Sequence, residues 1–356
     1  MPDLLTLGWN DFFEGAFAPY KTEGFLVGRV TEEHRGAYKV ANENGEMWAE
    51  ITGKIRFDAT SRADYPAVGD WVVLENLPNE KRASIQVVLP RRSKFSRKAA
   101  GKNNDEQIVA TNIDTVFLVQ ALNNDFNLRR LERYLVVAFE SGASPVIILN
   151  KADLCEDAEE KRLEVDSIAF GVPVHLISAK FEKGMEQLQE YLKVGRTIAF
   201  LGSSGVGKST LINRLLGADR QKVNEVREGD DRGRHTTTHR ELIVLESGGL
   251  LIDTPGMREL QLWEAGEGMT DNFSDIQEFA GQCQFNDCQH EREPNCAVKA
   301  ALESGELNAE RFENYKKMQK ELAFIATQQD KRLELERKEK WKKIHKTMNR
   351  IKPKRG

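Results

Sequence analysis

The chain has 356 residues, enough for two or three domains, and its 40% hydrophobic content is enough to build cores. The formal net charge of −4 conceals a basic tail, since residues 331–356 hold twelve basic and three acidic residues and carry +9 against −13 for the remainder; such a tail favours contact with a polyanion. The start lacks a signal-peptide pattern and no apolar run approaches the roughly eighteen residues needed to span a bilayer, so we expect a cytoplasmic protein without a membrane segment.

The first ninety residues predict a short extension followed by a small β-barrel. Residues 1–22 carry scattered aromatic side chains without a clear period, and we expect them to form a packing arm. Residues 23–90 contain short β-like runs separated by turn signals, at 25–30, 37–40, 47–55, 70–74 and 85–89. Five strands in so short a span favour a barrel of the OB type, which often binds nucleic acid. No interleaving of aromatic and basic residues marks a stacking face, so a barrel used only as a spacer remains the alternative.

A basic linker and an α/β domain follow. The predicted linker, residues 91–107, contains six cations between Arg91 and Lys102 and is either a solvated connector or a contact for a phosphate backbone. From 108 to 268 strands and helices alternate, which is the mark of a parallel sheet. The strands are predicted at 114–121, 145–149, 174–177, 197–201 and 250–252, with a helix over 128–140.

Two of these strands end in residues suited to reading a guanine base. One is followed by Asn150-Lys151-Ala152-Asp153 and the next by Ser178-Ala179-Lys180. A carboxylate at Asp153 can accept from the guanine ring N–H and amine, and a backbone N–H of the second motif can meet the guanine O6. Adenine satisfies neither group, so selectivity can be high. The predicted base-binding residues are Asn150, Lys151, Asp153, Ser178 and Ala179.

The next strand leads into a phosphate loop. The string from Gly202 to Ser209 is a full G-x-x-x-x-G-K-[ST] match between an apolar strand and a helical pattern, so an ordinary glycine-rich turn is the weaker interpretation. Its backbone N–H groups would surround phosphate oxygens, Lys208 would reach the β and γ phosphates as a catalytic residue, and Ser209 would bind Mg²⁺. The predicted nucleotide-binding residues here are Gly202, Ser203, Ser204, Gly205, Val206, Gly207, Lys208, Ser209 and Thr210. An ATPase would have no use for the guanine-reading residues.

Downstream residues complete the expected hydrolytic site. Asp253, in Asp253-Thr254-Pro255-Gly256, can hold Mg²⁺ through water, and the Gly256 N–H can sense a γ-phosphate. In the charged segment 219–240, Thr237 is the candidate Mg²⁺ ligand, unless its threonine run is only a surface turn.

The residue type at position 257 indicates that the chain alone hydrolyses GTP slowly. Many GTPases carry a water-orienting glutamine after this glycine, whereas this chain has Met257, so we expect slow intrinsic turnover and a substitute group. His235 is the candidate, although a lone histidine in a polar loop is often uninvolved.

The order of these motifs is unusual. Ordinary GTPases have the phosphate loop first and the guanine-reading motifs last, whereas here the guanine-reading motifs precede Gly202. A circular permutation preserves such a site, because strands meet in one sheet regardless of where the termini are cut. The segment that senses the γ-phosphate then leads directly into the C-terminal domain, so nucleotide exchange could move that domain.

Residues 269–356 predict a zinc-binding helical domain with a basic tail. The cluster Cys283-x4-Cys288-x-His290-x5-Cys296 supplies three thiolates and one imidazole, a closed shell suited to one structural Zn²⁺. Buried free cysteines are the alternative. Helices are expected over 297–302 and 308–324, and an apolar stripe in 338–354 either packs on this domain, binds RNA backbone or belongs to a solvated helix.

The barrel, the permuted motifs and the cysteine cluster together resemble the circularly permuted, small-ribosomal-subunit-dependent GTPases of the RsgA/YjeQ family, over about residues 20–325. The resemblance implies a cytoplasmic GTPase that binds the small (30S) subunit and its 16S rRNA late in maturation, through the barrel, the zinc domain and the tail. It also implies stimulation by that subunit, and it supports His235 as the catalytic group and the Cys3His spacing; we expect a monomer. A regulatory GTPase for a protein complex and a GTP-sensing scaffold that does not hydrolyse remain alternatives.

Overall fold

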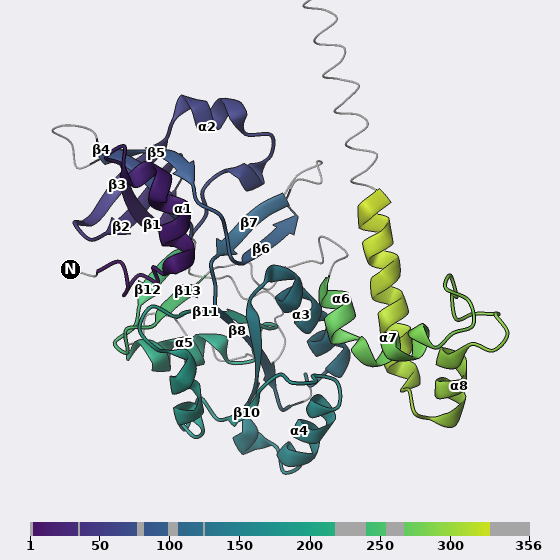
Figure 1. The fold of residues 1–356 in the computed structure, drawn as a ribbon. Coiled ribbons are helices and arrows are strands. Elements are labelled where there is room, and N and C mark those ends of the chain that lie inside the picture. The colour runs from purple at the N-terminus through teal and green to yellow at the C-terminus, as the bar shows by residue number, and fades with distance from the viewer. Residues whose placement is uncertain are drawn as a thin grey trace, which may run out of the picture. The chain divides into compact units, whose positions relative to one another are not determined.

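The computed structural model describes residues 3–34, 36–76, 82–98, 106–123, 125–217, 240–253 and 267–327 (Figure 1). They separate into two compact units: the described residues up to 274 form the first and 275–327 form the second. None of the helices in these ranges combines the length and the apolar character needed to cross a membrane.

The first unit begins with a closed five-stranded barrel, in agreement with the predicted OB-type fold. Its strands are β1 Leu26–His34, β2 Ala37–Asn42, β3 Gly45–Ile51, β4 Trp71–Asn76 and β5 Arg82–Val88. They follow the order β1-β2-β3-β5-β4, and β4 pairs back onto β1, which closes the barrel. Only β3 and β5 run parallel among these pairs. Side chains that alternate along the strands fill the interior, among them Val30, Val40, Val72, Leu74 and Ile85.

The barrel carries two helical additions. The predicted strand 47–55 ends at Ile51, because the Thr52 side chain caps a helix, α2 Gly53–Asp58, which is followed by the short turn η1 Arg62–Asp64. The N-terminal extension is also helical, as α1 Asp11–Lys21. Beside it, Trp9 lies edge-on to the buried Trp71 with ring centroids 4.6 Å apart, so the extension packs on the barrel through its aromatic side chains.

A predominantly parallel sheet forms the rest of the first unit. Its strands are β8 Thr115–Ala121, β9 Ser144–Asn150, β10 Val174–Ile177, β11 Thr197–Leu201, β12 Glu241–Val244 and β13 Leu250–Asp253. The order is β10-β9-β8-β11-β13-β12, with β12 alone antiparallel. The helices are α3 Leu128–Ser141, α4 Ala158–Asp166, α5 Lys208–Leu216 and α6 Glu267–Asn272, with 3-10 turns η2 Ala152–Leu154 and η3 Met185–Tyr191.

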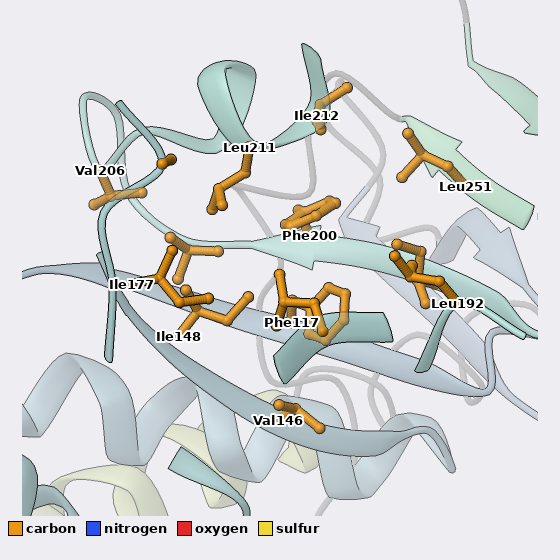
Figure 2. Close-up of a cluster of buried hydrophobic side chains, with 14 of the residues drawn as sticks. Phe117, Val146, Ile148, Ile177, Leu192, Phe200, Val206, Leu211, Ile212 and Leu251 are labelled. Carbon is orange, nitrogen blue, oxygen red and sulfur yellow. The ribbon is translucent and has the colours of Figure 1, made fainter. Parts of the chain in front are cut away.

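Apolar side chains from these strands and from α5 form one core beneath the phosphate loop (Figure 2). Phe117, Phe200 and Leu251 come from three adjacent strands, and Leu211 from α5 packs on them. Fully buried strands of this kind read as continuous apolar runs, which is why the sequence located them well. Because β8, β9 and β11 run parallel, their carboxyl ends lie at one edge of the sheet.

The barrel and the parallel sheet are joined by hydrogen bonds between strands. Barrel strand β1 pairs with β12 at Glu32 and Glu241, so the described strands of both parts form one eleven-stranded sheet. β6 Lys94–Lys98 lies within the predicted linker and pairs, in a separate sheet, with β7 Glu106–Thr111, which runs from the end of that linker into the predicted GTPase domain. Part of the expected connector is thus regular structure.

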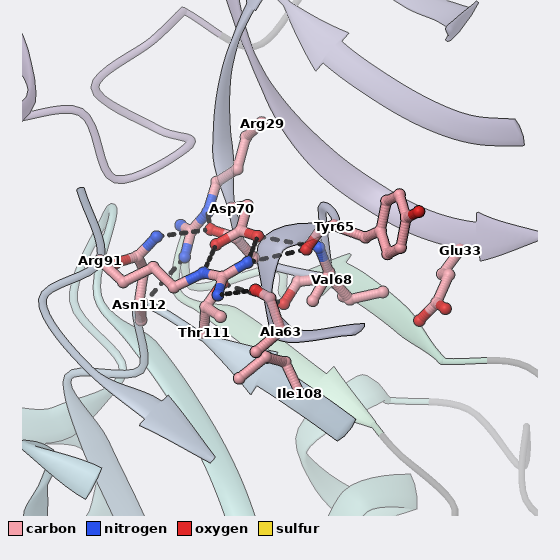
Figure 3. A network of polar contacts seen from close by, with 12 residues as sticks. Arg29, Glu33, Ala63, Tyr65, Val68, Asp70, Arg91, Ile108, Thr111 and Asn112 are labelled. Carbon is pink, nitrogen blue, oxygen red and sulfur yellow. Dashed lines mark hydrogen bonds and ion pairs between the residues drawn. The ribbon is translucent and has the colours of Figure 1, made fainter. Parts of the chain in front are cut away.

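Two arginines also bind the parts of this junction together (Figure 3). The guanidinium of Arg91 makes two bonds to the fully buried Asp70 carboxylate, at 2.8 and 2.7 Å, so this linker cation is not available to an external phosphate. Arg29 donates to backbone carbonyls of Leu7, Gly69 and Asn112. Burial lowers the pKa of Arg29 to about 10, which leaves it charged at neutral pH.

Segment 267–274 belongs with the parallel sheet. Asn272, at the end of α6, donates to the backbone carbonyl of Glu132 on α3, and the Gly268 N–H donates to Glu140 on the same helix. An added Cβ at Gly268 would lie 2.7 Å from the Val136 carbonyl oxygen, so glycine permits this close approach.

The second unit is helical, with α7 Ser274–Gly281, α8 Ala297–Ser304 and a further helix over 309–327. The bidentate pair of Arg311 with Asp275 ties the last helix to α7, with distances of 2.8 and 2.9 Å.

Candidate nucleotide site and metal centre

The phosphate loop joins β11 to α5 through residues 202–207. Gly205 and Gly207 have φ values of 78° and 100°, a region that favours glycine. Gly202 has ordinary φ but little room, because an added Cβ would lie 2.4 Å from the Val119 carbonyl oxygen on β8. The three glycines thus have local structural reasons for their positions, and α5 begins directly behind the loop with its N-terminus toward it.

Asn150 connects the guanine-reading motifs to this loop. Its side-chain amide is 2% exposed and donates from Nδ2 to the Val206 carbonyl at 2.8 Å. Its Oδ1 accepts the backbone N–H of Ala179 at 3.0 Å. One buried side chain therefore holds both segments, and an added Cβ at Gly207 would lie 2.2 Å from the same Nδ2. Segments that are 50 residues apart in sequence meet at one edge of the sheet.

The base-reading groups lie beside this connection. The Ser178 hydroxyl donates to the Asp153 carboxylate, so the two predicted base-binding residues are in direct contact. Lys151 has a left-handed backbone with φ 63°, which turns the chain sharply after β9. Asp153 is exposed, whereas Ser178 and Ala179 are buried. The Asp153 carboxylate is therefore accessible to a ligand, and the buried residues Ser178 and Ala179 support it from the protein side.

The predicted catalytic lysine lies over the first half of the phosphate loop. The Lys208 ammonium donates to the carbonyl oxygens of Gly202 and Ser203, at 2.7 and 2.6 Å. Ser209 follows it in the first turn of α5, and Asp253 ends β13, which pairs with β11. The lysine predicted to bind phosphate and two of the predicted Mg²⁺ ligands thus belong to adjacent elements.

Two residues at this loop were missed by the sequence analysis. Asp125 and Arg130 form a bidentate ion pair at 2.8 and 2.9 Å, and both contact the Ser203 hydroxyl at 2.8 Å. The Arg130 guanidinium, with help from Ser203, lowers the pKa of Asp125. No familiar motif contains these residues; the only local signal is the helix cap Asn127 between them.

Three predicted residues, His235, Thr237 and Gly256, lie outside the described residues, as does Met257.

The predicted metal ligands form a cluster in the second unit. The ligand atoms of Cys283, Cys288, His290 and Cys296 all lie within 4.8 Å of one another. His290 Nδ1 is 3.6 Å from the Cys283 sulfur and 3.4 Å from the Cys296 sulfur, and those sulfurs are 3.9 Å apart. A tetrahedral zinc ion, with Zn–S bonds of about 2.3 Å, requires sulfurs separated by about 3.8 Å, so this donor set fits one Zn²⁺ ion.

A carboxylate stabilises the loop between two of these ligands. Glu293 accepts backbone N–H groups from Gln289, Glu291 and Arg292, at 2.9 to 3.0 Å. Its own backbone N–H and that of Gln289 contribute most to lowering the pKa of Glu293, to about 2. His290 itself has φ 59°, so these bonds help to hold a sharp turn at a ligand position.

The comparisons with known proteins agree with this arrangement. Residues 88–263 match the family model described as RsgA GTPase. The small ribosomal subunit biogenesis GTPase RsgA of Opitutus terrae is 47% identical over 351 residues, covering 96% of each chain. RsgA 1 of Oceanobacillus iheyensis is 49% identical over 320 residues, covering 90% of this chain and 91% of that one.

Solved structures show the same architecture. The crystal structure of YjeQ from Thermotoga maritima aligns with a TM-score of 0.63 and 31% identity, covering 84% of this chain and 99% of that one. The structure of YloQ, described as a circularly permuted GTPase, gives a TM-score of 0.61 and 26% identity, covering 84% and 95%. The predicted fold class, a permuted GTPase with an N-terminal barrel, is therefore confirmed, and the chain belongs to the RsgA GTPase family.

Proposed function

We propose that the chain hydrolyses GTP and acts as a switch on the small ribosomal subunit late in its maturation. The observation that carries this proposal is the bridge made by Asn150, which holds the guanine-reading motif and the phosphate loop in one site. Family membership supports the reaction, and the relatives, described as small ribosomal subunit biogenesis GTPases, supply the ribosomal partner. Such a partner places the protein in the cytoplasm in this proposal.

The base and the phosphates are assigned to different groups in this site. Asp153 accepts from the guanine ring N–H and amine, and a backbone N–H of the Ser178-Ala179-Lys180 motif donates to O6. Lys208 and the loop N–H groups hold the phosphates, and the whole predicted set from Gly202 to Thr210 belongs to this part. Mg²⁺, when bound, neutralises charge that develops on the β and γ phosphates. Ser209, Asp253 and Thr237 would hold that ion.

The hydrolytic step needs a group that orients water. Met257 offers an apolar side chain and cannot serve, so we assign this role to His235 and the γ-phosphate contact to the Gly256 N–H. Nucleotide-dependent movement would pass from the residues after Asp253 into the C-terminal region, because the permuted chain runs in that order. Slow hydrolysis without the partner follows from the missing glutamine.

The metal cluster has a structural role in this proposal. Four protein ligands close the coordination shell, which leaves no position for a substrate. Zinc would fix the loop 283–296 against the helices of its own unit. The three proposed parts are the barrel at 23–90, the GTPase domain at 108–268 and the zinc domain at 269–356, with α6 packed on the GTPase part.

Contact with rRNA is assigned to the barrel, the zinc domain and the basic tail, with the protein acting as a monomer. Residues 331–356 carry a net charge of +9 against −13 for the remainder of the chain, so the tail should contribute to the salt dependence of binding.

One measurement tests the proposal directly: the rate of phosphate release from GTP, with and without purified small subunits. Stimulation by the small subunit, and none by the large subunit or by protein extract freed of ribosomes, is the expected result. Stimulation by the extract alone would favour a regulatory GTPase of a protein complex, and no hydrolysis under any condition would favour a GTP-sensing scaffold, which Met257 permits. Removing residues 330–356 should weaken subunit binding and flatten its salt dependence.

A further inference from the structure

A polar triangle lies on the outer side of the phosphate loop. Arg130 Nη1 donates to both the Asp125 carboxylate and the Ser203 hydroxyl, at 2.8 Å each, and Nη2 donates to the other carboxylate oxygen at 2.9 Å. The Ser203 hydroxyl in turn donates its proton to Asp125 at 2.8 Å. A hydroxyl has one proton to donate, so these bonds fix its rotation as well as its place.

The triangle includes a residue whose backbone carbonyl accepts from the predicted phosphate-binding lysine. The Lys208 ammonium donates to the Ser203 carbonyl at 2.6 Å and to the neighbouring Gly202 carbonyl at 2.7 Å. Gly202 is already confined by the Val119 carbonyl, which would lie 2.4 Å from an added Cβ. The Ser203 side chain is held from the segment that joins β8 to α3, through its hydrogen bonds with Asp125 and Arg130.

We propose that Arg130, held by Asp125, is a positioning residue for phosphate binding: it fixes Ser203 and thereby the first half of the loop and the Lys208 ammonium. This inference rests on the proposed function, since it concerns how the same site grips GTP. It adds to that function by assigning the binding of the phosphates and the binding of the base to different positioning residues. The base is read from segments held by Asn150, and Asn150 takes no part in the hydrogen bonds of the triangle.

The position of Arg130 on α3 makes it suited to this role. It lies in the first turn of the helix, where its own backbone N–H donates to the cap Asn127 at 2.9 Å. The cap fixes the backbone of Arg130 at the start of the helix, and the two bonds to Asp125 fix the plane of its guanidinium group. Lysine can carry the charge but cannot make the same fork of bonds, so it should restore the function only in part.

The inference predicts a specific pattern of nucleotide affinities. Arg130→Gln should weaken GTP and GDP binding about ten-fold, the effect of losing a hydrogen bond from a charged group. GMP affinity and the preference for guanine over adenine nucleotides should stay within two-fold of the parent chain. The GTP and GDP affinities of Arg130→Lys should lie between those of Arg130→Gln and the parent chain. If Arg130 had a purely structural role, its loss would lower all these affinities together.

A double-mutant cycle completes the test. Ser203→Ala removes the same link without changing charge and should reproduce the loss for GTP and GDP. The combined variant should be no weaker than either single variant, because residues in one network do not act additively. Arg162→Gln is the matched control, since Arg162 forms surface ion pairs with Glu159 and Asp166 on α4. It should leave every affinity unchanged.

Calorimetric titration with GMP, GDP and GTP, with a thermal melt of each variant, measures these quantities without ribosomes. Additive losses, or GTP affinities of Arg130→Gln and Ser203→Ala within two-fold of the parent, would overturn the inference. Failure of the proposed function has a different signature: a parent chain that binds GTP as described but is not stimulated by the small subunit. That outcome leaves the role of Arg130 standing.

Discussion

Replacing Asn150 with alanine tests the central feature of the site. The change removes the donor to the Val206 carbonyl and the acceptor of the Ala179 N–H. Both backbone groups belong to residues that are 1% exposed, so neither gains ready access to bulk water. A buried group left without its partner costs about 1–3 kcal/mol, so two such groups cost roughly 2–6 kcal/mol. A water molecule in the vacated space can bond to both groups, so we expect the free-energy cost to lie in the lower part of this range, at about 2–4 kcal/mol.

This cost should appear in nucleotide affinity. Apparent affinity falls with the fraction of molecules that hold the binding-competent arrangement, so the loss is bounded by the free energy above, about 30- to 700-fold. The assay is titration of fluorescent GDP, with a thermal melt to follow folding. Asn150→Asp, which keeps the acceptor but places an oxygen against the Val206 carbonyl, should be at least as damaging.

A matched control exists at the barrel junction. Asn112 is likewise buried, donates to the Gly69 carbonyl and accepts the Arg92 N–H, at 3.0 and 2.9 Å. Asn112→Ala should therefore lower the free energy of unfolding without a comparable change in GDP affinity. If Asn150→Ala left the GDP dissociation constant within three-fold of the parent, or if both variants weakened binding equally, the bridging role of Asn150 would be refuted.

The remaining predictions concern the base, the junction, the metal and the reaction. Asp153→Asn should weaken GDP about 10- to 100-fold and favour xanthine nucleotides, since an amide N–H can donate to the C2 carbonyl that xanthine carries in place of the guanine amine; competition titration decides, and unchanged base preference counts against the assignment. Asp70→Asn breaks a buried ion pair and should cost about 3 kcal/mol of stability in denaturant unfolding, whereas a cost near zero would show the pair to be dispensable. Metal analysis of the parent chain should find one equivalent of zinc, which Cys288→Ser should remove and the control Cys155→Ser should retain; zinc well below one equivalent in the folded parent chain would contradict the assignment. His235→Ala should lower the stimulated kcat while GTP affinity stays nearly constant, and an unaltered kcat would exclude this role.

The sequence was most informative where a local constraint dictates the residue. Gly205 and Gly207 are required by a left-handed backbone, and Lys208 and Ser209 follow at fixed spacing in the next helix. The buried strands were also predictable, because a strand covered on both sides reads as a continuous apolar run. The observed strand β10, for example, covers the predicted range Val174–Ile177.

Other features depend on residues that are distant in sequence. Neither α1 nor α2 shows a strong helical period, and their positions depend on packing and a cap. The basic run beginning at Arg91 predicted either a solvated connector or a contact for a phosphate backbone, because the sequence gives no sign that Arg91 will pair with the buried Asp70 carboxylate. The triangle of Asp125, Arg130 and Ser203 is likewise a product of β8 and β11 lying side by side.

By itself, then, the sequence determined the chemistry of this protein: a guanine-reading motif, a phosphate loop and a set of zinc-type ligands, each written in short spacings that backbone geometry and ligand chemistry restrict. The tertiary structure alone decided how these parts are held: the pairing of β1 with β12, the buried arginines of the junction and the side chains that fix the phosphate loop. The physical reason is that hydrogen bonds and ion pairs between distant segments require only compatible groups at the point of contact. No spacing along the chain records which groups will meet.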